Sequence, residues 1–80
     1  MFKDKVLVIT GGTGSFGKTV LSRFLKTDIS EIRIFSRDEK KQHDMRVRLN
    51  NPKVKFYIGD VRNYNSIHSA MRGEDYVFQA

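Results

Sequence analysis

A glycine-rich turn follows the apolar segment Val6–Thr10 and precedes a segment with helical periodicity. Residues 12–17 fit the pattern G-x-G-x-x-G of dinucleotide-binding turns, and residues 12–19 also fit G-x-x-x-x-G-K-[ST], the pattern of mononucleotide P-loops. In both kinds of site, glycines let the backbone approach a phosphate, and the N-terminus of the following helix offers that phosphate unpaired N–H groups. The sequence therefore predicts a phosphate-binding turn, and a glycine-rich turn without a ligand is the simpler alternative.

A second position helps to decide between the two nucleotide patterns. A dinucleotide site recognises the adenosine ribose about 20 residues beyond the glycines, and Arg37 follows Gly17 by 20 residues. An NAD-selective site has Asp or Glu there, whereas the Ser36 hydroxyl and the Arg37 guanidinium fit the 2′-phosphate of NADP. The same segment has the S-x-x-E pattern of a capping box, in which Ser36 caps a helix and Glu39 bonds back to it. Capping gives Arg37 no role, so the segment favours NADP.

The P-loop interpretation assigns other roles to neighbouring residues. Lys18 would reach the phosphates, Thr19 would bind Mg²⁺, and Asp60 would be the metal-associated carboxylate of a later strand. Phe16 is a bulky apolar residue inside the turn. Such a side chain suits a dinucleotide turn that packs onto a sheet better than a phosphate cradle. These residues favour dinucleotide binding and leave the P-loop as the rival.

The hydrophobic pattern predicts strands and helices in alternation, βαβαβαβ. The expected strands are Lys5–Thr10, Ile32–Phe35, Val54–Ile58 and a last one within 74–80, and the expected helices follow the glycines, span about 38–49 and span about 64–72. Strands joined through helices pair in parallel with right-handed crossovers. The expected fold is therefore α/β of Rossmann type, with three layers α/β/α and strand order 3-2-1-4. At the carboxyl ends of the strands, three segments then share one edge: Gly11–Gly17, Ser36–Arg37 and Asp60–Val61.

Apolar residues one helical turn apart predict which helix faces are buried. In the first helix these residues are Phe16, Val20, Leu21, Phe24 and Leu25. In the third helix they are Tyr64, Ile67 and Met71, and Gly73 is the expected helix stop.

Composition limits the class of protein. The chain has 80 residues, 39% hydrophobic and 30% charged, and its last strand has no polar tail, so we expect residues 1–80 to be the N-terminal part of one NADP-binding domain. The net charge of +6 is spread along the chain among acidic residues, which argues against a nucleic-acid partner. Without cysteine and with two separated histidines, the sequence predicts no metal site. Neither a membrane-spanning run nor a signal peptide is evident, so we expect a cytoplasmic protein without a membrane partner.

Three segments together resemble a known family. Residues 10–17 match the T-G-x-x-G-x-x-G of extended short-chain dehydrogenases/reductases. Residues 36–42 and 59–62, S-R-D-E-K-K-Q and G-D-V-R, resemble the corresponding segments of UDP-N-acetylglucosamine 4,6-dehydratases, including the type that inverts C5. The resemblance covers nearly the whole chain, and the later two segments are more specific than the first. Asn63 stands where the family often has Asp.

The resemblance implies an NADP-dependent enzyme that acts on UDP-N-acetylglucosamine in the synthesis of capsule and other polysaccharides. Sugar C4 is oxidised by hydride transfer to NADP⁺, water is eliminated across C5–C6, and the hydride returns to C6. The resemblance also implies a homo-oligomer, and it places the catalytic residues after residue 80, so none is assigned here. A sugar epimerase or reductase of the same superfamily is one alternative, and a P-loop NTPase is the other.

The resemblance also implies which residues bind the cofactor. The glycine-rich turn would hold the pyrophosphate, the segment after the second strand the 2′-phosphate with its ribose, and Asp60 with Val61 the adenine. The residues so assigned are Gly11, Gly12, Thr13, Gly14, Ser15, Phe16, Gly17, Ser36, Arg37, Asp38, Glu39, Lys40, Lys41, Asp60, Val61 and Ala80. Ala80 would begin the fourth-strand segment beside the cofactor.

Overall fold

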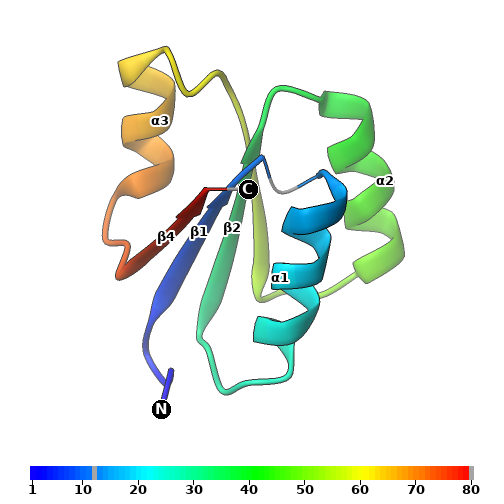
Figure 1. Ribbon diagram of the computed structural model, residues 1–80, viewed down its shortest axis with the longest axis vertical. Coiled ribbons are helices and arrows are strands. Elements are labelled where there is room, and N and C mark those ends of the chain that lie inside the picture. The colour runs from blue at the N-terminus through cyan, green and yellow to red at the C-terminus, as the bar shows by residue number, and fades with distance from the viewer. Residues whose placement is uncertain (12, 80) are drawn as a thin grey trace.

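The computed structural model describes residues 1–11 and 13–79, and Gly12 and Ala80 lie outside the described residues. Strands and helices alternate along the chain (Figure 1). They are β1 (Val6–Thr10), α1 (Ser15–Leu25), β2 (Glu31–Ser36), α2 (Glu39–Leu49), β3 (Val54–Ile58), α3 (Tyr64–Met71) and β4 (Tyr76–Gln79). In this part of the chain the strands form one parallel sheet in the order β3-β2-β1-β4, which confirms the expected Rossmann-type fold. No helix in these ranges is both long and apolar enough to cross a membrane.

Rows of aliphatic side chains cross the sheet because the strands pair in register. Leu7 lies opposite Ile32, which in turn lies opposite Val54. Two residues further along, Ile9 lies opposite Ile34. Successive side chains of a strand point to opposite faces, so these residues share one face of the sheet, where all of them are buried.

Helices α1 and α2 cover this face (Figure 1). Val20 and Leu21 of α1 and Met45 of α2 are buried in the same cluster as the aliphatic rows. Burying one such side chain contributes about 1.5–3 kcal/mol to stability. The packing therefore holds the N-termini of both helices next to the carboxyl ends of the strands that precede them.

Helix α3 lies on the opposite face of the sheet (Figure 1). Val8 and Phe35 point to that side and are fully buried, as is Ala70 of α3. On the same face, Lys55 of β3 and Val77 of β4 are exposed. Helix α3 thus shields the centre of the sheet and completes the three-layer arrangement.

Arg33 of β2 connects the sheet to the C-terminus of α3. Its guanidinium donates hydrogen bonds to the backbone carbonyls of Ala70, at 3.0 Å, and Arg72, and its Nε donates to the Glu31 carboxylate. The last carbonyls of a helix have no partner within the helix, and a cation is favourable at that end of the helix dipole. Arg33 therefore anchors the end of α3 that lies far from the carboxyl edge of the sheet.

Two apolar residues are less buried than their periodicity suggests. Tyr64 is 73% exposed and stacks on His68, with ring centroids 5.5 Å apart, so the prediction that it belongs to a buried stripe is wrong. Helix α3 begins beyond the carboxyl edge of the sheet, where the strands do not reach its first turn (Figure 1). Phe16 is 61% exposed, so it too lies mostly outside the core that was expected to bury it.

We expect Arg33→Met to lower the free energy of unfolding by about 1–3 kcal/mol, because two carbonyls lose a charged donor. Lys55→Met is the matched control, since Lys55 is in register with Arg33 on the neighbouring strand but is exposed. Its effect should stay within about 0.5 kcal/mol. Chemical denaturation of the intact protein measures both values, and equal losses would contradict the anchoring role of Arg33.

Candidate nucleotide-binding site

The carboxyl ends of the strands surround one hollow of about 470 Å³. It is lined by Thr10 and Gly11 after β1, by Phe35, Ser36 and Arg37 at β2, by Gly59, Asp60, Val61 and Arg62 after β3, and by Gln79 of β4. The structure thus brings together the three segments that the sequence places at this edge. Arg62 and Gln79 were not among the predicted site residues. The position of Gln79 could have been found from strand order, because it lies opposite Thr10 across the parallel pair.

The glycine-rich turn begins with a backbone conformation that favours glycine. Gly11 has a φ of 69°, in the left-handed region, and its N–H donates to the Phe35 carbonyl at 2.8 Å. Gly14 is the N-cap residue of α1, and its carbonyl accepts from the Lys18 N–H at 2.9 Å. Because a glycine has no side chain with which to cap, the first-turn amides of α1 face the turn without a side-chain acceptor from the N-cap position. This end of α1 suits an anion such as a pyrophosphate.

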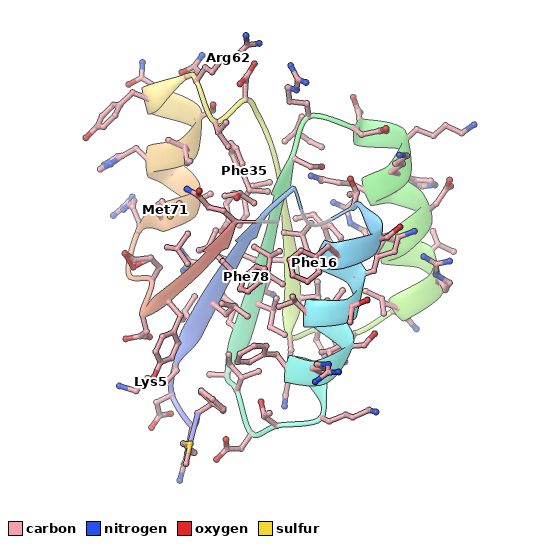
Figure 2. All side chains as sticks on the ribbon, in the orientation of Figure 1. Lys5, Phe16, Phe35, Arg62, Met71 and Phe78 are labelled. Atoms are coloured by element: carbon pink, nitrogen blue, oxygen red, sulfur yellow. The ribbon has the colours of Figure 1, made fainter. Side chains whose placement is uncertain are left out.

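Residues 13–17, around this helix N-terminus, differ in their exposure to solvent. Thr13 and Gly17 are buried, whereas Ser15 is exposed. Phe16 meets Phe78 of β4 edge to face, with ring centroids 5.5 Å apart (Figure 2). Phe16 thus packs against the side chain of an edge strand while most of its surface stays exposed.

Ser36 is held inside the protein by Gln42 of α2. The Gln42 amide donates to the Ser36 hydroxyl at 2.9 Å and to the Tyr57 carbonyl of β3 at 2.8 Å. Both side chains are buried, and the Gln42 Oε1 atom has no hydrogen-bond partner within the part of the chain that the structure describes. Gln42 thus joins the carboxyl ends of β2 and β3. Sequence reasoning missed it, although it lies three residues before Met45 on the same helix face.

The capping alternative for Ser36 and Glu39 is wrong. Asp38 is the N-cap of α2, and its carboxylate accepts from the Lys41 backbone N–H at 2.9 Å. Glu39 is therefore the first residue of the helix rather than the third, which is the position that a capping box requires.

The remaining predicted residues lie around two further hollows. One, of about 520 Å³, is lined by Thr13, Ser36, Arg37, Asp38 and Glu39. The other, of about 270 Å³, lies between α1 and α2 and is lined by Thr13, Gly14, Ser15, Lys18, Lys41, Asp44 and Arg48. Lys40 is exposed on the first turn of α2. Arg37 lines both the 520 Å³ hollow and the 470 Å³ hollow at the strand ends, so one guanidinium borders both spaces.

Asp60 lies between two guanidinium groups at the mouth of the strand-end hollow. Arg62 binds the carboxylate through its backbone N–H at 2.9 Å and through Nη2 at 2.8 Å, and Arg37 approaches it with Nη1 at 3.6 Å. The hydrogen bonds from Arg62 hold the pKa of the Asp60 carboxyl well below its usual range, with a smaller contribution from Arg37. The carboxylate is therefore ionised at neutral pH. Val61 is exposed beside it.

The P-loop roles of Lys18 and Thr19 do not fit this geometry. The Thr19 hydroxyl donates to the Ser15 carbonyl at 3.1 Å, within the helix. Lys18 does not border the hollow at the strand ends; it lines the hollow between α1 and α2, beside Gly14 and Ser15 of the turn. A P-loop lysine and threonine instead face the phosphates and Mg²⁺. The site therefore favours a dinucleotide.

Comparison with known proteins shows to which family the chain belongs. A family model described as "Polysaccharide biosynthesis protein" matches residues 7–80. The chain belongs to this polysaccharide biosynthesis family. Relatives in several Rickettsia species are named UDP-glucose 4-epimerase. The one from Rickettsia bellii strain RML369-C is 76% identical over 84 residues, covering 100% of this chain and 25% of the relative. The chain thus spans about a quarter of the length of the curated relatives it matches.

Solved structures share the fold. Pen from Bacillus thuringiensis matches with a TM-score of 0.93 and 43% identity, over 100% of this chain and 26% of Pen. The Bordetella bronchiseptica enzyme WbmF, solved in complex with NAD⁺, matches with a TM-score of 0.75 and 18% identity, over 99% of this chain and 23% of WbmF. Together with the T-G-x-x-G-x-x-G turn, the family match and the relatives place this polysaccharide biosynthesis protein among the extended short-chain dehydrogenases/reductases.

We expect Gln42→Ala to destabilise the protein by about 1–3 kcal/mol, because the buried Ser36 hydroxyl and the Tyr57 carbonyl lose their donor. His43→Ala changes the next, exposed residue of α2 and should have an effect within about 0.5 kcal/mol. Thermal unfolding of the two variants of the intact protein makes the comparison. If Gln42→Ala unfolds at the same temperature as His43→Ala, Gln42 does not join the strand ends.

Proposed function

We propose that this chain binds the adenosine half of NADP in an enzyme that oxidises C4 of a UDP-sugar. The observation that carries the proposal is the position of Arg37. Its side chain is 71% exposed at the end of β2, and it borders both the strand-end hollow and the 520 Å³ hollow that Thr13 and Asp38 also line. A cation at this position complements a 2′-phosphate, whereas an NAD-selective site has a carboxylate there.

The residues at the strand ends fit the parts of such a cofactor. The turn at Gly11 and Gly14 and the first amides of α1 would hold the pyrophosphate. Arg37, with Lys41 nearby on α2, would hold the 2′-phosphate, and Asp60 with Val61 would border the adenine. The buried Ser36 hydroxyl already accepts from Gln42, so a bond from Ser36 to the phosphate stays a prediction. The roles of Gly12 and Ala80, which lie outside the described residues, stay predictions as well.

The bound nicotinamide would supply a hydride acceptor for sugar C4, and this chain would bind and orient the adenosine end of the cofactor. The S-R-D-E-K-K-Q and G-D-V-R segments support a UDP-N-acetylglucosamine 4,6-dehydratase, in which loss of water across C5–C6 follows. The names of the Rickettsia relatives support a second candidate, a UDP-glucose 4-epimerase. Both activities begin with oxidation of C4, so the cofactor proposal is common to them. We propose further that the enzyme is a homo-oligomer in the cytoplasm. Its proton-transfer groups would belong to the part of the protein beyond residue 80.

Arg37→Ala should weaken NADP⁺ binding by about 1.5–3 kcal/mol, because a charged hydrogen bond to the 2′-phosphate is lost. NAD⁺ has no 2′-phosphate, so its affinity should change much less. Lys18→Ala is the control, because it removes a cation of the rival P-loop pattern and should leave NADP⁺ binding nearly unchanged. Calorimetric titration of the intact protein with NADP⁺, NAD⁺ and Mg·ATP measures these affinities. Tight Mg·ATP binding that depends on Lys18 would overturn the proposal.

Products distinguish the two activities. Incubated with UDP-N-acetylglucosamine, a 4,6-dehydratase yields a 4-keto-6-deoxy sugar that has lost one water. A 4-epimerase converts UDP-glucose to an isomer of the same mass. Mass spectrometry of the intact protein's products with each sugar should show loss of water from the N-acetylated sugar. Chromatographic separation of the UDP-sugars detects isomers of equal mass, and isomerisation of UDP-glucose without any dehydrated product would replace the dehydratase by the epimerase.

A further inference from the structure

A charged cluster of three residues lies at the mouth of the strand-end hollow, and the proposed function uses only two of them. Arg37, Asp60 and Arg62 all border this hollow. Both guanidinium groups meet the same carboxylate oxygen, Oδ2 of Asp60, Arg62 at 2.8 Å and Arg37 at 3.6 Å. The two arginines therefore compete for one partner.

The competition is unequal because the Arg62 contact is local. The turn that follows β3 is closed by a hydrogen bond from the Asn63 N–H to the Asp60 carbonyl, at 2.8 Å. Within it, Arg62 donates its backbone N–H to Oδ1 at 2.9 Å, and its Nε lies 3.2 Å and 3.3 Å from the two carboxylate oxygens. Arg37 reaches the same group from another strand with one longer contact. Arg62, within the same turn, thus neutralises most of the negative charge of the Asp60 carboxylate.

This arrangement affects an anion that approaches Arg37. An unpaired Asp60 carboxylate would repel a phosphate and would also hold Arg37 more strongly. Arg62 weakens both effects, because it neutralises the carboxylate from the other side. Arg37 and Arg62 are 71% and 77% exposed, so the effect is limited by solvent and reduced by salt.

We infer that Arg62 is a specificity-determining residue, which favours NADP over NAD by neutralising Asp60 and so leaving Arg37 available to the 2′-phosphate. The inference rests on the proposed function, since it concerns the same cofactor site. Arg62 acts through Asp60 and needs no contact with the cofactor. It therefore changes the ratio of the NADP affinity to the NAD affinity. Residues that border the adenine, which both cofactors contain, change the two affinities together.

The test measures the dissociation constants of NADP⁺ and NAD⁺ for the intact protein at low salt. Arg62→Gln should weaken NADP⁺ about two- to fivefold, the range for an exposed ion pair, and leave NAD⁺ unchanged. Arg62→Lys keeps the cation and should retain most of the wild-type ratio. Arg23→Gln removes the same charge from the exposed last turn of α1, at the other end of that helix from the glycine-rich turn, and should change neither affinity.

A double variant tests whether Arg62 acts through Asp60. Asn at position 60 keeps an acceptor for the Arg62 N–H but has no charge, and any altered contact with adenine cancels in the ratio of the two affinities. Asp60→Asn with Arg62→Gln should therefore show the same ratio as Asp60→Asn alone. The inference is overturned if Arg62→Gln leaves the ratio unchanged, or if its effect has the same size in the Asp60→Asn background. If the wild-type protein binds NADP⁺ no more tightly than NAD⁺, the proposed function itself is wrong, whatever the Arg62 variants show.

Discussion

The parallel pairing of β1 with β2 is the constraint on which the rest of the site depends. Its register buries Ile9 beside Ile34 and continues to Thr10 opposite Phe35. One residue further, the Gly11 N–H donates to the Phe35 carbonyl. The glycine-rich turn and the residues after Phe35 consequently leave the sheet side by side. A slip of one residue would move Ile32 and Ile34 out of the cluster beneath α1 and α2 and place Arg33 in it, so hydrophobic burial fixes this register.

The end of β2 changes from buried to exposed within three residues. Phe35 is buried on the side of α3, and Ser36 is held by Gln42. Arg37, the next residue, extends into solvent at the mouth of the hollow. Gln42 also binds the end of β3, so a buried amide adds to the strand pairing that holds these two ends together. The exposed cation therefore follows directly on a strand end that β3 and Gln42 hold in place.

Charge at this edge is arranged by two different kinds of contact. Asp60 and Arg62 pair within one turn, a contact that depends little on the rest of the fold. Asp60 and Arg37 meet only because β2 and β3 are neighbours in the sheet. At the opposite edge, Arg33 binds the carbonyls at the end of α3. Arginines thus make contacts at both ends of the sheet, where one binds the end of a helix and the others meet a carboxylate.

Local sequence signals were enough to predict the order of elements, their parallel pairing and the meeting of three segments at one edge, because periodicity and glycine placement act over a few residues. They gave wrong answers for Tyr64 and for capping by Ser36, because periodicity shows a helix face but not how far the sheet extends beneath it. The hydrogen bond from Gln42 to Tyr57 and the contact of Arg37 with Asp60 connect residues that are far apart in sequence, so local signals did not predict them. The sequence by itself thus determined the fold and the chemistry available at its edge. Only the tertiary structure decided which polar groups pair there, since those distances are set by packing between strands and helices.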